Sequence, residues 1–129
     1  MAQGSSTMST ITLGLLLILA LSCMTTVVHG AQWFVGDAKG WSFGVSDWPS
    51  GKQFHAGDVL EFSYDQKIHN VVAVDEDAYN KCQVPVGGGT PYNSGDDHIT
   101  LNPGKSFFMC SIPGHCQQGM KIAVEAIPA

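Results

Sequence analysis

Beyond residue 30 the chain consists of short segments in which apolar and polar residues alternate, with turn-forming residues between them. A period of two places apolar side chains on one face of a β-strand, whereas an amphipathic helix needs a period near 3.6. Many short strands in roughly 100 residues predict an all-β fold, a two-sheet sandwich with Greek-key connections. The expected strands are residues 32–35, 59–64, 70–74, 99–101, 106–110 and 121–126.

One or two short helical turns are expected beside the strands. Residues 75–81 begin with Asp75, Glu76 and Asp77. Acidic side chains are favoured in the first turn of a helix, where the backbone dipole is positive. This stretch is therefore the best candidate for a helical turn.

The first thirty residues differ in composition from the rest. They contain no Asp, Glu, Lys or Arg, and residues 13–21 form a compact apolar run. An uncleaved membrane anchor would need about 20 predominantly apolar residues, but Ser22 and two threonines interrupt this stretch. We interpret residues 1–30 as a secretory signal peptide, although no Lys or Arg precedes the apolar run. Removal before Ala31 leaves one domain, residues 31–129, in the extracellular space.

The charge of the chain excludes several classes of partner. Six Lys and Arg residues against eleven Asp and Glu give a net charge of −5, and no basic cluster occurs. Nucleic acid is therefore not an expected partner. No apolar tail follows Pro128 and Ala129, which predicts that no lipid or membrane anchor is attached at this end. We expect a monomer.

The cysteines pose a question of pairing. Cys23 lies in the leader, so the mature domain keeps Cys82, Cys110 and Cys116. In an oxidising compartment an odd number leaves one thiol unpaired. A Cys110–Cys116 bond would leave Cys82 free, and a Cys82–Cys116 bond would leave Cys110 free. The spacing alone does not choose between them.

The residues around Cys110 point to copper. His115 follows five residues after Cys110, Met120 follows five residues later, and His69 stands at the start of a predicted strand. Two imidazoles and a thiolate with a weak axial thioether are the ligands of a blue-copper electron-transfer site. Zinc fits less well, because structural zinc sites are completed by Cys and His rather than by methionine. We therefore predict one type 1 copper held by His69, Cys110, His115 and Met120.

Other reactive residues have simpler interpretations. Met109 alternates away from Cys110 and is expected in the core. His55 and His98 are expected on the surface. Cys110 as a catalytic nucleophile would need an orienting acid and a substrate cleft, and no motif supplies either.

The motifs resemble those of the phytocyanins, plant blue-copper proteins, and in particular their plantacyanin branch. The resemblance covers residues 32–124. It rests on residues 33–36, 40–41, 51–54, 57–60, 69–72, 79–82, 103–110 and 113–124.

The resemblance implies a cupredoxin-like sandwich with copper on His69, Cys110, His115 and Met120. It also implies a disulfide between Cys82 and Cys116, which keeps Cys110 for the metal. The related stellacyanins have Gln at the position of Met120. Members of the plantacyanin branch are typically basic, whereas this chain is acidic, and it lacks the Pro/Ser-rich stalk of many phytocyanins.

These observations predict a small secreted electron carrier of the plant cell wall space rather than an enzyme. Its redox partner, a small molecule or a protein, is not identified by the sequence. The alternative is an extracellular copper-binding module in signalling or in the wall, whose role is not electron transfer. A copper enzyme is the weakest hypothesis, because four ligands leave no open coordination position. Asn70, beside His69, is predicted to hydrogen-bond to the Cys110 loop and orient the thiolate.

Overall fold

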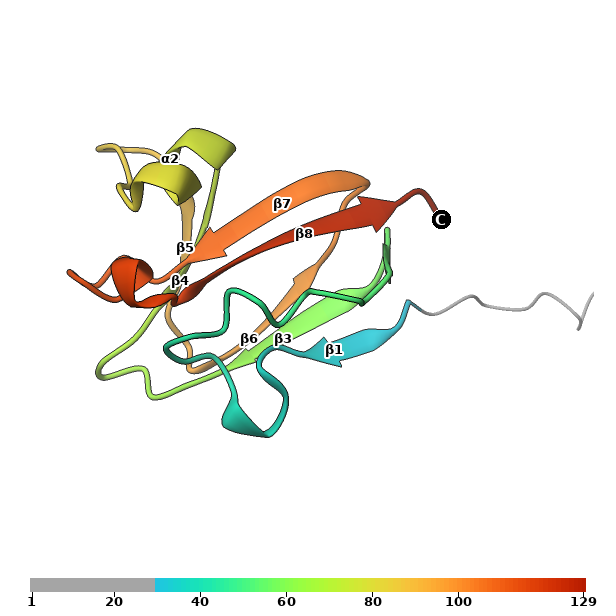
Figure 1. Ribbon diagram of the computed structural model, residues 1–129, viewed down its shortest axis with the longest axis horizontal. Helices are drawn as coiled ribbons and strands as arrows, with labels where there is room; N and C mark the ends of the chain where they lie inside the picture. Colours follow the sequence, from blue (N-terminus) through green and yellow to red (C-terminus); the bar gives the residue numbers. More distant parts are fainter. Residues whose placement is uncertain (1–29) are drawn as a thin grey trace, which may run out of the picture.

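The computed structural model describes residues 30–129, so the predicted leader up to His29, including Cys23, lies outside the described residues. The chain forms two β-sheets packed face to face, with one short α-helix and two 3-10 turns around them (Figure 1). The predicted two-sheet β-sandwich is confirmed.

Both sheets are mixed. The smaller one has the order β1-β3-β6, with β1 (Gln32–Phe34), β3 (Val59–Ser63) and β6 (Asp96–Thr100). The larger one has the order β2-β8-β7-β4-β5, with β2 (Phe54–His55), β8 (Lys121–Ile127), β7 (Gly104–Met109), β4 (Val71–Val74) and β5 (Thr90–Tyr92). The β1–β3 and β2–β8 pairs are parallel and the others antiparallel. The chain crosses repeatedly between the sheets, as Greek-key sandwiches do.

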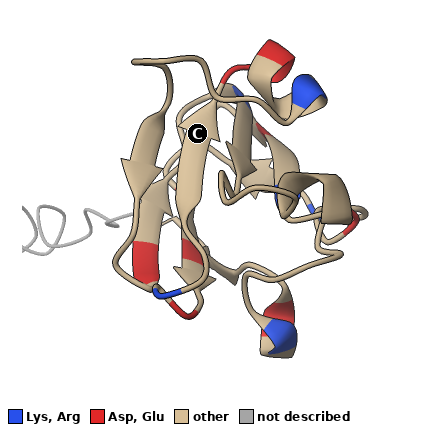
Figure 2. Ribbon diagram, turned by 90° about the vertical axis from the view of Figure 1, so that its left-hand side faces the viewer, with Lys and Arg blue, Asp and Glu red and all other residues tan. Residues whose placement is uncertain are grey.

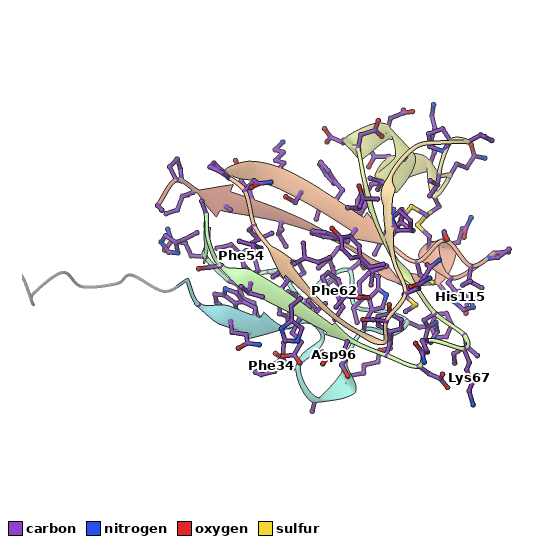
Figure 3. The ribbon with its side chains drawn as sticks, turned by 180° about the vertical axis from the view of Figure 1, so that it is seen from behind. Phe34, Phe54, Phe62, Lys67, Asp96 and His115 are labelled. Carbon is purple, nitrogen blue, oxygen red and sulfur yellow. A yellow bond between two sulfur atoms is a disulfide. The ribbon has the colours of Figure 1, made fainter. Side chains whose placement is uncertain are left out.

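The core lies between the two sheets. Strand β8 alternates buried and exposed residues along its length, and the smaller sheet contributes Leu60 and Phe62, both fully buried. Figure 3 shows Phe62 inside the sandwich, with His115 at one end and Phe54 toward the other. Trp41 is 1% exposed, and its indole N–H donates to the Asn70 carbonyl. The core therefore reaches the end of the molecule where the predicted ligands lie.

The predicted helical turn is confirmed as α2 (Glu76–Lys81). Its N-cap is Asp75, whose carboxylate accepts the backbone N–H of Ala78 at 2.8 Å, and this contact satisfies a donor that the helix leaves free. Two 3-10 turns, η1 (Asp37–Lys39) and η2 (Cys116–Gln118), bring the helical turns of residues 30–129 to three rather than one or two.

The strand prediction missed β2 and β5 and began β6 three residues late. The first half of β6 is polar, and Asp97 points inward. Its carboxylate accepts hydrogen bonds from the hydroxyls of Tyr64 and Ser94. An inward-facing acid satisfied by neighbouring hydroxyls breaks the alternation on which the prediction relied.

No helix within residues 30–129 is long and apolar enough to cross a membrane. The basic and acidic side chains lie scattered over strands, turns and α2 rather than on one face (Figure 2).

Candidate metal centre

Strand pairing brings His69 and Cys110 to the same end of the larger sheet. Strands β4 and β7 are antiparallel neighbours with Val72 opposite Met109. His69 precedes the start of β4, and Cys110 follows the end of β7. Two residues far apart in sequence therefore lie on adjacent loops.

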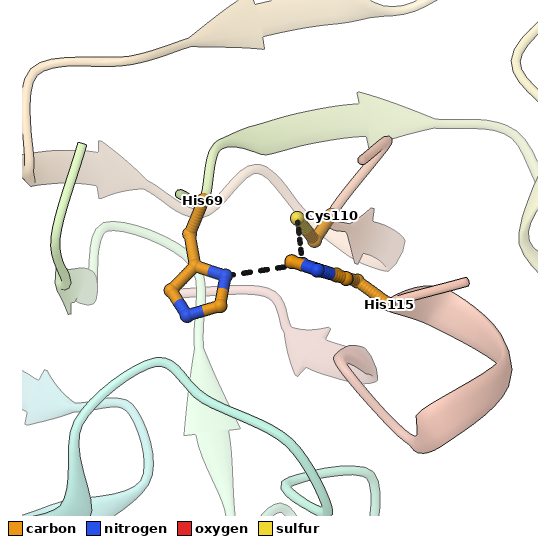
Figure 4. Close-up of side chains that lie close together, drawn as sticks. All are labelled: His69, Cys110 and His115. Carbon is orange, nitrogen blue, oxygen red and sulfur yellow. Dashed lines mark hydrogen bonds between the residues drawn. The ribbon is translucent and has the colours of Figure 1, made fainter. Parts of the chain in front are cut away.

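The three strongest predicted ligands converge (Figure 4). The Nδ1 atoms of His69 and His115 are 3.1 Å apart, and the Cys110 sulfur lies 3.5 Å from His115 Nδ1. One ligand atom from each of the three residues lies within 4.8 Å of the other two. Cys110 is fully buried and His69 is 9% exposed, whereas His115 is half-buried. The Cys110 and His69 side chains are thus shielded from solvent, and the cluster is accessible to solvent at His115.

Burial lowers the pKa of His69 below its ordinary value, and the nearby His115 lowers it further. Both effects disfavour the imidazolium, because it loses hydration and meets a second ring that also takes up protons. A neutral imidazole is the form that binds a metal ion. The environment of His69 therefore favours its ligand form.

Met120 lies fully buried in the same cluster of core residues as Cys110. The backbone N–H of Cys110 donates to the Met120 carbonyl at 3.0 Å, and the N–H of Met120 donates to the His115 carbonyl at 3.2 Å. These bonds close the loop that carries all three residues, so that a shift of one displaces the others.

Asn70 makes the predicted contact with the loop that follows Cys110. Its side-chain amide donates to the Ser111 hydroxyl at 2.7 Å, and its side-chain carbonyl accepts the Ser111 backbone N–H at 2.8 Å. Asn70 thus holds the residue directly after Cys110 at two points. A role in orienting the thiolate stays a prediction.

Phe43 is a neighbour of the cluster that the sequence did not reveal. Its ring centroid lies 4.8 Å from that of His115 and 5.5 Å from that of His69, with both rings in edge contact. The loop carrying Phe43 is bonded to the ligand loop, because the N–H groups of Gly44 and Val45 donate to the carbonyls of Gln118 and Gly119. A lone Phe in a turn carries no sequence signal for a metal site, so only the fold could show this contact.

Gly119 permits the close approach of these two loops. A Cβ there would lie 3.1 Å from the Gly44 Cα, and the residue has a φ of 81°. Side chains other than glycine are disfavoured by both the space and this left-handed backbone.

The disulfide joins Cys82 to Cys116 and leaves Cys110 as the free cysteine of residues 30–129. Cys82 follows α2 directly, and Cys116 follows His115 and begins η2. This pairing answers the question that the cysteine spacing left open. It fastens the His115 loop to the helix while the metal cluster keeps its thiol.

The cluster fits a bound copper ion by its chemistry and by its spacing. In zinc proteins the metal–ligand bonds are about 2.0 Å to nitrogen and about 2.3 Å to sulfur. Two donor atoms bound to one ion at such distances therefore lie roughly 3–4 Å from each other. The separations of 3.1 and 3.5 Å agree with this. A thiolate with two imidazoles and a thioether nearby is the donor set of blue copper.

Comparison with known proteins gives the family. Residues 33–120 match the plastocyanin-like domain family. The chain belongs to the phytocyanin family of blue copper proteins. Chemocyanin from Lilium longiflorum is 48% identical over 128 residues, which cover 98% of this chain and 99% of the relative. The basic blue protein of Arabidopsis thaliana is 44% identical and covers 98% of this chain and 100% of the relative.

The solved structure of cucumber basic protein, a blue copper protein, superimposes with a TM-score of 0.73 at 48% identity. The match covers 75% of this chain and 100% of that structure. The likeness confirms the cupredoxin fold. One type 1 copper is accordingly the cofactor of this phytocyanin.

A second group of possible ligands lies on β3 and β6 of the phytocyanin. His98 Nε2 is 3.0 Å from an Asp96 oxygen and 3.4 Å from a Glu61 oxygen. The group contains no sulfur, and Asp96 and His98 are exposed. It lacks the soft ligand of blue copper.

Proposed function

We propose that this phytocyanin is a small extracellular electron carrier that holds its copper on His69, Cys110, His115 and Met120. The observation that carries the proposal is the convergence of the two imidazole Nδ1 atoms on the buried Cys110 thiol. Bound copper supplies one-electron chemistry by alternating between Cu(II) and Cu(I). The Cys110 thiolate and the two imidazoles would be its strong ligands, and the Met120 thioether would be a weak one.

The surroundings of the cluster support a carrier that changes little between its two oxidation states. Any rearrangement of the ligands would add to the barrier for electron transfer. Backbone bonds close the loop from Cys110 to Met120, the Cys82–Cys116 disulfide fastens it at His115, and Asn70 holds Ser111. Each contact restrains a different point of the loop that carries Cys110, His115 and Met120.

His115 is the proposed point of electron entry. Its ring is half-buried, whereas Cys110 is fully buried and His69 nearly so. Exposed apolar side chains occur in the same loops: Phe43 is 38% exposed, Ile68 54% and Ile112 37%. Such residues suit brief contact with a redox partner, a small molecule or a protein, because they are desolvated at little cost.

Two further features support an extracellular carrier without enzymatic activity. The leader-like residues 1–30 and the disulfide suit an oxidising compartment. Four protein ligands leave no open coordination position, whereas catalytic metal sites keep one for water or substrate.

The test is a titration of the purified protein with Cu(II), followed by visible absorption and then by addition of ascorbate. We expect one equivalent to produce an intense blue band that ascorbate bleaches and oxygen or ferricyanide restores. Cys110→Ser should lose the band, because the absorption arises from the copper–thiolate bond. His98→Asn is the matched control for uptake at the second group of ligands and should keep the full band.

A colourless complex, or a blue band that survives Cys110→Ser, would contradict the proposal. Slow electron exchange by an intact blue site would instead favour the copper-binding module in signalling or in the wall. Steady turnover of oxygen or a phenol would contradict the non-enzymatic role.

A further inference from the structure

A buried carboxylate lies at the end of the sandwich away from the copper cluster. Asp58, in the turn before β3, is 2% exposed. Its Oδ1 accepts the backbone N–H of Ala31 at 2.9 Å, and its Oδ2 accepts the indole N–H of Trp33 and the backbone N–H of His55, each at 2.9 Å. All the donors are neutral N–H groups.

The Asp58 carboxylate is charged, and the His55 imidazole is the side chain near it that can carry a positive charge. Burial alone would raise its pKa, but the donors from Trp33, His55 and Ala31 and, to a smaller extent, the charge of the His55 imidazole outweigh burial and hold the pKa below its ordinary value. None of the ion pairs formed by residues 30–129 includes Asp58. A buried charge outside an ion pair is costly, and a cation in direct contact would offset that cost.

Ala31 occupies the one position where the backbone itself could provide the cation. Its nitrogen faces Asp58, while its carbonyl accepts the N–H of Val59 at 2.8 Å. Gly30 packs so closely that a Cβ there would lie 2.0 Å from the Gly57 carbonyl oxygen. The chain can continue upstream of Ala31 only through a glycine, whereas a chain that begins at Ala31 has no such restriction.

We propose that the Gly30–Ala31 bond is the processing site of this chain and that the new α-ammonium group of Ala31 forms an ion pair with buried Asp58. A leader-removing peptidase breaks the peptide C–N bond with water. The hydroxyl group goes to the Gly30 carbonyl carbon, which becomes a carboxylate, and the Ala31 nitrogen gains protons and becomes an ammonium. A neutral amide donor thereby becomes a charged one at the same place.

The ion pair fastens β1 to the turn that precedes β3. A hydrogen bond between two charged groups is roughly twice as strong as one between neutral groups, and the pair neutralises the buried charge. The contact lies next to β2, and Figure 3 shows Phe54 of β2 toward the opposite end from His115. The inference therefore does not rest on the proposed function.

The first experiment expresses the full chain in plant cells and determines the N-terminus of the exported protein by intact mass and terminal sequencing. We expect the mature chain to begin at Ala31. Any other first residue overturns the proposal.

The second experiment is a double-mutant cycle on the mature domain. The match to the solved chain of cucumber basic protein covers 100% of that chain and 75% of this one, so the domain is expected to fold without the leader. Chains beginning at Ala31 or at Gly30 are compared, each with Asp58 or with Asp58→Asn. At neutral pH, and with Asp58 present, we expect the chain that begins at Gly30 to have a folding equilibrium constant about tenfold lower than the chain that begins at Ala31. In the Asp58→Asn background the same two chains should differ by less than about twofold.

An equal loss in both backgrounds, or no loss in either, would overturn the ion pair. If Asp58→Asn does not fold, acetylation of the Ala31 α-amino group replaces it, because the acetyl group removes the charge and keeps an N–H donor. Acetylated protein should show the same loss as the chain that retains Gly30, and unchanged stability would overturn the proposal.

Discussion

At the scale of single residues, the sequence identifies the predicted metal ligands more readily than the residues that pack around them. His69, Cys110, His115 and Met120 are chemically distinctive, and three of them share one short loop. Phe43 is chemically ordinary and reaches the cluster only because its loop bonds to Gln118 and Gly119. The clustering of His69, Cys110 and His115 could therefore be predicted, whereas the apolar cover of the site could not.

Phe43→Ala should lower the reduction potential. Removal of the ring admits water to the edges of both imidazoles, and a more polar environment favours the more highly charged Cu(II) state. Protein voltammetry measures the shift. Phe34→Ala is the matched control, since Phe34 is exposed and lies far from His115 (Figure 3). Equal potentials in the two variants would show that Phe43 does not shield the site.

Met120→Gln should keep copper and lower the reduction potential, because an oxygen donor in the axial position stabilises Cu(II) more than a thioether does. Voltammetry with the blue band as a check on occupancy measures both effects. An unchanged potential would mean that Met120 is not the axial ligand.

Asn70→Ala should speed the loss of copper to a chelator and shift the potential, because Ser111 would lose both of its partners and the Cys110 loop would loosen. The time course of bleaching after a chelator is added gives the rate. The exposed Asn102 supplies the control variant, Asn102→Ala, which should behave as the wild type. Identical rates in all three proteins would remove the proposed role of Asn70.

At the scale of elements, the strongly alternating strands were predictable and the others were not. Strands β3 and β8 follow the alternation of their sequences, and α2 follows its acidic first turn. Strand β5 contains Pro91 and spans three residues, so its pairing with β4 comes from the sheet rather than from local preference. The first half of β6 was also missed, because the inward-facing Asp97 breaks the alternation of apolar and polar residues.

Tyr64 links elements of both sheets and should make stability depend on alkaline pH. Its hydroxyl bonds to Asp97 of β6 and to the Tyr92 carbonyl of β5. Burial and the bond to Asp97 raise the pKa of Tyr64 to about 12. A raised pKa stabilises the folded state below the ordinary tyrosine value near 10, and this stabilisation is lost as pH rises from there toward 12.

Unfolding by denaturant between pH 8 and about 12 would compare wild type with Tyr64→Phe. The variant should be less stable at pH 8, because Asp97 loses a donor, and its stability should fall less steeply above pH 10. Parallel curves for the two proteins would contradict this assignment.

At the scale of the whole molecule, this chain has a negative net charge, whereas two of its relatives are named "basic blue protein". All charged side chains lie beyond residue 30 and sum to −5. They lie scattered over the fold rather than on one face (Figure 2). A distant reagent therefore meets a negative field from most directions, and this field should govern encounter rates.

The blue copper form should consequently exchange electrons faster with cationic reagents than with anionic ones of similar driving force. Salt should slow the reaction with a cationic cobalt(III) complex and speed the reaction with ferricyanide. Both changes should be several-fold as the Debye length falls from about 30 Å at 0.01 M to about 10 Å at 0.1 M. Stopped-flow mixing of the reduced protein with each reagent measures the rates. Opposite slopes would establish steering by net charge, whereas flat plots would show that the apolar side chains around His115 alone control the encounter. In that case a partner could not be sought by its charge.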